Sequence, residues 1–264
     1  MKKYLVIGDP IDHSLSPMLH NYWMKMNNIN AIYEKKKISE DEIKILITEI
    51  KEKKIDGINV TVPYKKKVIP FLDKLSLEAE NTQSVNTIYL ENNKIVGHNT
   101  DIEGFENSIK NVKYNIIGKH VLILGSGGVV PSIIFALNKM KVAKIILSNR
   151  TISKAEKLKD KYKDLKIVKW GDIPEFDVII NATSVGLNQG DEIGIDLSKT
   201  GKNKLFYDVI YNPKQTNFLK LGKKLGNQSE NGKMMFIFQA QKSFKKWHNI
   251  LPEVNKEVMD LLDD

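Results

Sequence analysis

The stretch His120-Val-Leu-Ile-Leu-Gly-Ser-Gly-Gly128 is the clearest indication of a fold in this chain. Its first half is an apolar run typical of a buried strand, and its glycines predict a tight turn. The segment from Ile133 to Met140 is then predicted to form a helix. A strand, a glycine-rich turn and a helix in this order bind dinucleotide phosphates at the helix N-terminus. The sequence therefore predicts an α/β domain whose phosphate-binding turn contains Gly125, Gly127 and Gly128.

The end of the next strand indicates which dinucleotide this turn suits. Val130 stands where the G-x-G-x-x-G fingerprint carries its third glycine, so the turn alone is a moderate signal. The strand expected at 144–148 ends in Asn149-Arg150-Thr151, with no Asp or Glu for a ribose 2′-hydroxyl. Arg150 is the single arginine among 41 basic residues, and its guanidinium suits a 2′-phosphate better than a chance surface ion pair. NADP is therefore favoured over NAD.

The composition limits the class of protein. The chain has 264 residues, 41% of them hydrophobic, which is enough for one large or two modest domains. It has no cysteine, which excludes disulfides, thiolate catalysis and cysteine-ligated metals. The net charge of +9 comes from scattered lysines, so we expect no nucleic-acid partner. No apolar stretch is as long as a signal-peptide core or a membrane span, so we expect no membrane association and a cytoplasmic location.

The first hundred residues alternate between strand-like and helix-like segments. Helices are predicted to start at Ser16-Pro17, where proline suits the first helical position, and at the capping box Ser39-Glu-Asp-Glu42. This alternation predicts an α/β unit with a mainly parallel sheet. Strands are expected at 3–7, 31–38, 56–62, 87–90 and 94–96, the last two as a hairpin.

A second α/β unit begins near residue 120, so we expect two domains with a boundary between 101 and 118. Ser153-Lys-Ala-Glu156 is predicted to cap a helix. The segment 234–251 carries apolar residues at helical spacing and is predicted to bury one helical face. Strands are expected at 120–124, 144–148, 166–169, 177–180 and 205–209.

Two serines precede the first predicted helix. Ser14 and Ser16 offer two hydroxyls beside a helix N-terminus, which suits a carboxylate or a phosphate. A simple N-cap role would explain Ser16 but leaves Ser14 without a function.

A second polar group accompanies the strand expected at 56–62. Asn59 and Thr61 lie on the same face of that strand, and Lys65 lies just beyond its end. If Pro63 opened a helix, Lys65 would lie in the first turn, where the helix dipole disfavours a cation. The alternative for Lys65 is one more solvated lysine in a lysine run.

Asn86 and Asp101 flank the predicted hairpin. Asp101, taken by itself, is best explained as the cap of the helix that follows it. His13, His20 and His98 occur near these motifs without the spacing of metal ligands, so we expect no metal site.

In combination these motifs resemble the shikimate dehydrogenase family, from Asp9 to Trp247. Eight motifs in the same order make the match far more specific than any one of them. They are Ser14-Leu-Ser-Pro17 with His20-Asn21, Asn59-Val-Thr-Val-Pro-Tyr-Lys65, Val85-Asn86-Thr87, Gly97-His-Asn-Thr-Asp101-Ile-Glu-Gly104, Asn149-Arg-Thr151, Asn181-Ala-Thr-Ser184, Tyr211-Asn-Pro213, and Gly232-Lys-Met-Met235 with Gln239-Ala240.

The resemblance implies an N-terminal α/β substrate domain over residues 1–103 and an NADP-binding Rossmann domain over 104–235. C-terminal helices within 236–264 are expected to pack back on the first domain and complete it. The implied reaction is the reversible NADPH-dependent reduction of 3-dehydroshikimate to shikimate, a step of aromatic amino-acid biosynthesis. We expect a monomer or a homodimer.

The resemblance also implies roles for individual residues. Ser14 and Ser16 would bind the substrate carboxylate, and Lys65 and Asp101 would form the catalytic pair. Further substrate contacts are implied for Asn59, Thr61, Asn86, Gln239 and Tyr211, with Asp101 among them. Cofactor contacts are implied for Gly125, Gly127, Gly128, Asn149, Arg150, Thr151, Lys154, Thr183, Gly232 and Met235, with Thr183 and Met235 nearer the nicotinamide.

Physical chemistry supports the catalytic pair. Hydride addition to a ketone builds negative charge on oxygen, which a neighbouring ammonium both stabilises and can protonate. Lys65 could therefore act as the proton donor or mainly as an electrostatic and orienting group, with Asp101 holding it in place.

Three other functions fit parts of the sequence less well. An NAD-preferring quinate/shikimate dehydrogenase is disfavoured by Arg150 and by the two serines, Ser14 and Ser16, which the extra hydroxyl of quinate would crowd. A regulator that binds the ligand without turnover is disfavoured by the intact Lys65 and Asp101. A nucleic-acid binder predicts a strongly salt-dependent affinity for DNA.

Overall fold

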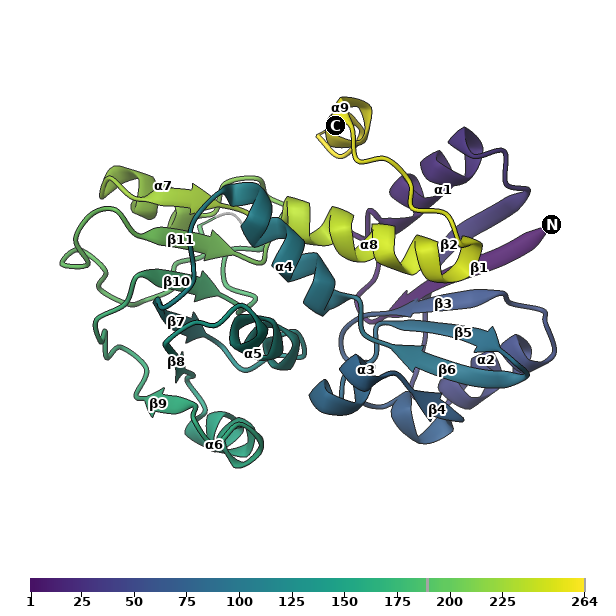
Figure 1. The fold of residues 1–264 in the computed structure, drawn as a ribbon, viewed down its shortest axis with the longest axis horizontal. Helices are drawn as coiled ribbons and strands as arrows, with labels where there is room; N and C mark the ends of the chain where they lie inside the picture. The colour runs from purple at the N-terminus through teal and green to yellow at the C-terminus, as the bar shows by residue number, and fades with distance from the viewer. Residues whose placement is uncertain (189, 264) are drawn as a thin grey trace. The chain divides into compact units, whose positions relative to one another are not determined.

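The computed structural model describes residues 1–188 and 190–263, and Figure 1 shows the arrangement of its helices and strands. The chain forms two compact units. Unit 1 contains residues 1–104 and the segment from Ile237 onward, and unit 2 contains Phe105–Phe236. The chain leaves unit 1 within helix α4 (Asp101–Val112) and returns within helix α8 (Lys233–His248). Each unit has its own six-stranded sheet.

Unit 1 is built on a mixed sheet with strand order β2-β1-β3-β5-β6-β4. Strand β5 runs antiparallel to both of its neighbours, so the expected mainly parallel sheet is only partly realised. The hairpin between β5 and β6 turns through Asn92 and Asn93, whose φ angles of 49° and 61° suit the twist of a tight hairpin. The strands are β1 (Lys2–Gly8), β2 (Ala31–Lys37), β3 (Gly57–Val60), β4 (Lys74–Leu75), β5 (Thr87–Glu91) and β6 (Lys94–His98).

Helix α2 (Glu42–Lys51) packs its apolar stripe into the core of unit 1. It begins at Glu42, and the Glu42 carboxylate accepts a hydrogen bond from the Ser39 backbone N–H at 2.8 Å. One of the two bonds of the predicted capping box is therefore present. Residues 62–68 after β3 form turns and no helix, so Pro63 does not open a helix. The other helical segments of unit 1 are α1 (Ser16–Met26), η1 (Ile69–Phe71), α3 (Leu77–Thr82) and α9 (Lys256–Leu261).

Helix α8 packs on unit 1 through aromatic contacts. The fully buried Phe244 lies at a ring-centroid distance of 5.7 Å from Trp23 of α1. A Cβ on Gly57 would lie 2.4 Å from the indole nitrogen of Trp247, so only glycine admits the indole at this place on β3. The indole N–H also donates to the Ile88 carbonyl at 3.3 Å. The expected return of the C-terminal helix to the first domain is confirmed.

Unit 2 is built on a fully parallel sheet with strand order β12-β11-β10-β7-β8-β9. In chain order this is the 3-2-1-4-5-6 arrangement of a doubly wound fold, with the order reversing between β7 and β10. The predicted α/β class with a Rossmann domain is confirmed. The strands are β7 (His120–Leu124), β8 (Lys144–Ser148), β9 (Lys166–Val168), β10 (Val178–Asn181), β11 (Leu205–Asp208) and β12 (Gln228–Glu230).

The helices of unit 2 differ from expectation at their starts. Helix α5 (Val130–Lys139) begins three residues before the predicted Ile133, with Pro131 in its first turn, where the missing N–H is harmless. Helix α6 (Ile152–Lys161) begins directly after Thr151, so Ser153 lies inside the helix and the predicted cap there is wrong. Helix α7 (Asn217–Lys224) is capped by the Thr216 hydroxyl.

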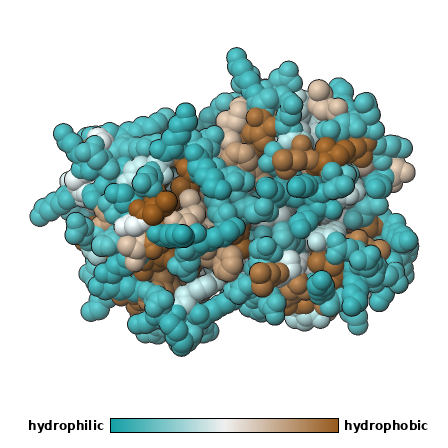
Figure 2. All heavy atoms as spheres, viewed as in Figure 1, coloured by the Kyte–Doolittle hydropathy of each residue, from teal (hydrophilic) through white to brown (hydrophobic). Residues whose placement is uncertain are grey.

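On the face shown in Figure 2, hydrophilic side chains predominate, as the lysine-rich composition leads one to expect. Within the described part of the chain, no helix is both long and apolar enough to cross a membrane.

Candidate active site

The structure brings Lys65 and Asp101 together in unit 1. Lys65 lies in the turns after β3. Asp101 is the first residue of α4, and two residues connect it to the end of β6. The Lys65 Nζ lies 2.5 Å from the Asp101 Oδ2, and the side chains are only 13% and 7% exposed. Because no helix begins at Pro63, Lys65 does not lie in the first turn of a helix of its own. The Lys65 carbonyl accepts the Val85 N–H at 2.9 Å, which anchors this turn to the strand region.

Asn86 holds the other side of the Asp101 carboxylate. Its Nδ2 donates to the Asp101 Oδ1 at 2.8 Å, and its Oδ1 accepts the Thr100 N–H at 2.8 Å. At the start of α4 the backbone N–H of Asp101 donates to the Asn99 side chain at 3.0 Å. Among the described residues, Asp101 bonds to Lys65 and Asn86 through its side chain and to no helix amide. The helix-cap explanation of Asp101 is therefore wrong, and the carboxylate faces the ammonium.

Asn59 is buried inside a network of side chains that come from four elements. Its Nδ2 donates to the Asn86 carbonyl at 2.9 Å and to the Ser243 hydroxyl at 3.0 Å. The Ser243 hydroxyl, on α8, also lies 2.7 Å from the Thr87 hydroxyl and 3.2 Å from that of Thr100. Sequence analysis missed Ser243 because nothing in the local pattern of α8 marks it as a partner of β3.

The two serines lie at the start of α1, and Tyr33 of β2 contributes its hydroxyl to the network around Asn59. The Ser14 Oγ accepts the Ser16 N–H at 3.3 Å, and Ser16 is the first residue of α1, with Leu15 at the N-cap position. The N-cap explanation of Ser16 is therefore wrong. The Tyr33 hydroxyl donates to the Asn59 Oδ1 at 2.8 Å. Burial raises the pKa of Tyr33 well above its ordinary value, and an interaction with Ser16 lowers this pKa by a smaller amount.

The remaining residues assigned to the substrate lie in different surroundings. The Gln239 Oε1 accepts a long 3.4 Å hydrogen bond from Asn86. Thr61 is half-buried, and its methyl group would lie 2.5 Å from a Cβ on Gly8. Tyr211 belongs to unit 2, where its ring stacks on Phe236 at a centroid distance of 4.6 Å.

In unit 2 the glycine turn connects β7 to α5. Gly125 has a φ of +104°, and a Cβ on it would lie 2.8 Å from the Ala182 carbonyl oxygen. The fold therefore requires glycine there. A Cβ on Gly127 would have its nearest neighbour at 3.7 Å, and one on Gly128 would have none within 4 Å. This open space before α5 is where a phosphate would approach the backbone, so the turn fits a dinucleotide.

The arginine after β8 is exposed and unengaged. Within the described part of the chain, Arg150 makes no hydrogen bond or ion pair, and Lys154 lies exposed one turn further along the chain. The Asn149 Nδ2 donates to the Thr151 carbonyl at 2.7 Å, which closes the turn around Arg150. A free guanidinium on a closed turn can bind a phosphate bidentately.

The other residues assigned to the cofactor have structural contacts of their own. The Thr183 hydroxyl donates to the Asn181 Oδ1 at 2.7 Å, and its methyl group would lie 2.9 Å from a Cβ on Gly125. A Cβ on Gly232 would lie 2.1 Å from the Val209 carbonyl oxygen, so close backbone approach accounts for this glycine. Met235 is buried in α8.

Two further polar residues of unit 2, Asn181 and Asp208, are fully buried and were not predicted as site residues. They end the adjacent strands β10 and β11, and their side chains lie 3.1 Å apart. Burial raises the pKa of Asp208 to about 6. A polar residue that ends a buried parallel strand was the signal available in the sequence, because ligands bind at this edge of such sheets.

Comparison with known proteins yields the same family for both units. Residues 6–88 match the model of the shikimate dehydrogenase substrate-binding domain. Residues 107–209 match the model named shikimate/quinate 5-dehydrogenase. The chain is 58% identical over 262 residues to the shikimate dehydrogenase (NADP(+)) of Pelagibacter ubique, covering 99% of each protein. It is 38% identical to the enzyme of the same name from Staphylococcus haemolyticus, covering 96% of this chain and 94% of that one.

Solved structures agree with the sequence comparisons. Shikimate dehydrogenase from Aquifex aeolicus superposes with a TM-score of 0.89 at 37% identity, covering 100% of this chain and 97% of that one. The Thermus thermophilus enzyme, solved with NADP(H) and shikimate, has a TM-score of 0.90 at 26% identity, covering 100% and 98%. A buried lysine–aspartate pair, a dinucleotide turn and full-length similarity at 58% identity lead to one conclusion: the chain belongs to the shikimate dehydrogenase family.

Proposed function

We propose that this protein catalyses the reversible reduction of 3-dehydroshikimate to shikimate with NADPH. The observation that carries the proposal is the buried Lys65–Asp101 pair, which Asn86 supports, in a unit that matches a substrate-binding domain. In this proposal residues 1–103 with 236–264 bind the substrate, and residues 104–235 bind the cofactor.

Lys65 would act on the substrate carbonyl oxygen. Among the described residues its ammonium donates one N–H, to Asp101, which leaves two N–H groups for the substrate. When bound, NADPH supplies the hydride to the carbonyl carbon. The ammonium would stabilise the negative charge that develops on the oxygen and can deliver the proton that completes the alcohol. Asp101 would fix the direction of the ammonium and balance its charge.

The substrate carboxylate would lie at the start of α1, between the hydroxyls of Ser14 and Ser16. The ring-hydroxyl end of the site is supported by Tyr33, whose hydroxyl donates to the Asn59 Oδ1 at 2.8 Å. The ring hydroxyls and the neighbourhood of the substrate are assigned to Asn59, Thr61, Asn86, Asp101, Gln239 and Tyr211.

NADP would bind in unit 2, with its pyrophosphate over the glycine turn and its 2′-phosphate on Arg150. The open space at Gly128 and the free guanidinium support this placement. The residues that would hold the cofactor are Gly125, Gly127, Gly128, Asn149, Arg150, Thr151, Lys154, Thr183, Gly232 and Met235.

We further propose that the enzyme is cytoplasmic and that it is a monomer or a homodimer. Its substrate and cofactor are small anionic molecules, which a chain of net charge +9 attracts electrostatically.

A cofactor-reduction assay with the purified protein tests the function. Shikimate and quinate are each offered with NADP⁺ and with NAD⁺, and we expect the highest kcat/KM for shikimate with NADP⁺. A preference for quinate with NAD⁺ would instead identify a quinate/shikimate dehydrogenase. Absence of turnover with all four pairs, together with shikimate binding in calorimetry, would identify a ligand-binding regulator.

Replacing Lys65 tests the catalytic pair. We expect Lys65→Ala to lower kcat by a hundredfold or more, about 3 kcal/mol at ~1.4 kcal/mol per decade, with a smaller change in shikimate KM. Lys66→Ala, which removes the exposed neighbouring lysine, should keep its kcat. Near-normal turnover of Lys65→Ala would refute the assignment of the pair.

Replacing Arg150 tests the cofactor phosphate. We expect Arg150→Ala to raise the KM for NADP⁺ by roughly tenfold or more, since a charge-assisted hydrogen bond is worth about 1.5–3 kcal/mol, and to leave NAD⁺ nearly unaffected. Lys157→Ala, an exposed lysine of α6, serves as the control. Equal losses for NADP⁺ and NAD⁺ would remove Arg150 from the 2′-phosphate.

The glycine turn offers a test that separates folding from binding. A Cβ at residue 128 meets nothing within 4 Å, so Gly128→Ala should keep the melting temperature while it weakens NADP⁺ binding. Gly125→Ala should lower the melting temperature, because φ is positive and the Ala182 carbonyl is too close. Unchanged NADP⁺ affinity of Gly128→Ala, measured by calorimetry, would contradict the phosphate site.

A further inference from the structure

Two buried side chains tie together the loops that leave the carboxyl edge of the unit 2 sheet. The Asp208 carboxylate is fully buried at the end of β11. Its Oδ1 accepts the Asn181 side-chain amide at 3.1 Å and the Ile210 N–H at 3.0 Å. Its Oδ2 accepts the Thr216 hydroxyl at 2.6 Å. One carboxylate therefore fixes the end of β10 and both ends of the loop before α7.

Asn181 also holds the loop that follows β10, through hydrogen bonds to Thr183 and Val185. Its Oδ1 accepts both the N–H and the hydroxyl of Thr183, at 3.1 and 2.7 Å. Its Nδ2 donates to the Val185 carbonyl at 3.0 Å, and the Val185 N–H donates back to the Thr183 hydroxyl at 3.1 Å. The hydroxyl of Thr183 thus donates one hydrogen bond and accepts one, and Asn181 sets its position.

The loop after β10 in turn lies against the glycine turn. The Ala182 carbonyl oxygen and the Thr183 methyl group would be 2.8 and 2.9 Å from a Cβ on Gly125. A shift of this loop by a few tenths of an ångström therefore changes the space over the glycine turn. The chain of contacts runs from Asp208 through Asn181 and Thr183 to Gly125.

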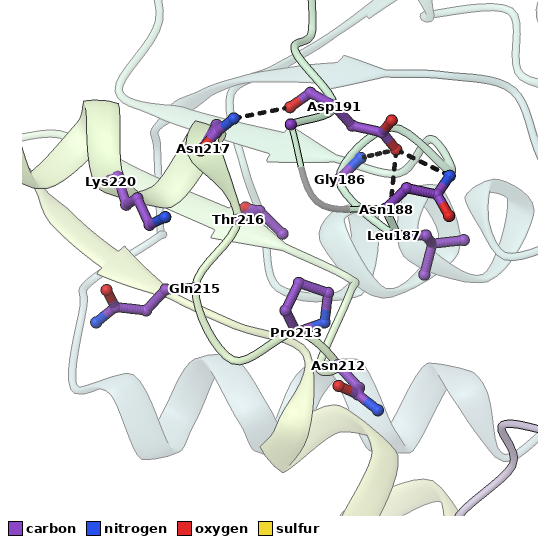
Figure 3. Close-up of a pocket in the computed structure, with 11 residues that line it drawn as sticks. Gly186, Leu187, Asn188, Asp191, Asn212, Pro213, Gln215, Thr216, Asn217 and Lys220 are labelled. Carbon is purple, nitrogen blue, oxygen red and sulfur yellow. Dashed lines mark hydrogen bonds between the residues drawn. The ribbon is translucent and has the colours of Figure 1, made fainter.

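The same two loops also meet in the pocket of Figure 3, where Gly186 and Thr216 both contribute to the lining. There the Asn217 side chain donates to the Asp191 carbonyl at 3.1 Å, which connects the start of α7 to the loop after β10.

The chemistry of Asp208 indicates a role beyond folding. Among the described residues it has no ion-pair partner, and burial raises its pKa to about 6, so the ionised form is held at a cost. An amide of the same shape accepts hydrogen bonds at one oxygen only, whereas the carboxylate accepts three bonds at two oxygens. Retaining a costly buried group at the ligand-binding edge of the sheet is typical of functional sites.

We propose that Asp208 and Asn181 are positioning residues for the pyrophosphate and nicotinamide end of NADP, acting through Thr183 and the glycine turn. This inference rests on the proposed function, because it requires the cofactor to bind in unit 2. It assigns to the two residues no contact with the reacting atoms.

The test compares Asn181→Ala and Asp208→Asn with the matched control Asn227→Ala. Asn227 is also buried in unit 2, and it also bridges two segments, accepting the Lys204 N–H at 2.9 Å and donating to the Gly201 carbonyl at 3.0 Å. It lies before β12, at the amino end of that strand, away from the carboxyl edge. Melting temperatures identify variants that are folded at the assay temperature.

Two ligands separate the two ends of the cofactor. Full NADP⁺ covers both ends, and adenosine 2′-phosphate covers only the end assigned to Arg150. We expect Asn181→Ala to raise the Kd of NADP⁺ by roughly tenfold, equivalent to one buried hydrogen bond, and Asp208→Asn to raise it severalfold. For both variants, the Kd of adenosine 2′-phosphate and the KM of shikimate should stay within about twofold of the wild-type values. For the control Asn227→Ala, these two constants and the Kd of NADP⁺ should all stay within the same range.

Unchanged NADP⁺ affinity in the folded variants would overturn the inference, and so would equal losses for both ligands. If Asn181→Ala does not fold, Asp208→Asn carries the test with the same two ligands, because it alters the carboxylate that holds Asn181. Failure of the wild-type protein to bind NADP⁺ would contradict the proposed function instead.

Discussion

The polar interior of unit 1 depends on the buried pair of Lys65 and Asp101. Removing two charges from water costs several kcal/mol per ion, and the pair is stable only if the remaining hydrogen-bonding positions are satisfied. Asn86 satisfies the second carboxylate oxygen, and Thr100 fixes Asn86 in turn. Asn86 also accepts a hydrogen bond from Asn59 at its carbonyl, so the hydrogen bonds that satisfy the buried pair continue to Asn59 and the hydroxyls around it.

A different constraint, close approach of backbones, shapes unit 2. Gly125 and Gly232 are places where a Cβ would meet a backbone carbonyl at 2.8 and 2.1 Å. Gly128 has no such neighbour, so the fold does not require its glycine. The glycines of one motif therefore differ: packing against the next loop requires Gly125, whereas the open space at Gly128 is consistent with the proposed phosphate site.

Local signals predicted helix starts with mixed success, and the reason is physical. Ser39 and Glu42 form a bond of the predicted capping box because both partners lie within one turn. Ser153-Lys-Ala-Glu156 has the same pattern, but α6 has already begun at Ile152, immediately after the turn that Asn149 closes onto Thr151. The antiparallel direction of β5 could likewise not be predicted from the local sequence, because it depends on pairing with β3, about 30 residues earlier.

The motifs of the sequence were enough to predict the family and the two α/β units, and they marked Lys65, Asp101 and Arg150 as candidate functional residues. These follow from ordered motifs and from residue types whose chemistry is specific. The orientation of Asp101, the support of Asn59 by Ser243 and the hydrogen bond between Asp208 and Asn181 became visible only in the folded chain. Such hydrogen bonds join residues 15 to 184 positions apart, and they exist only once strand register and helix packing bring the side chains within 3 Å or so.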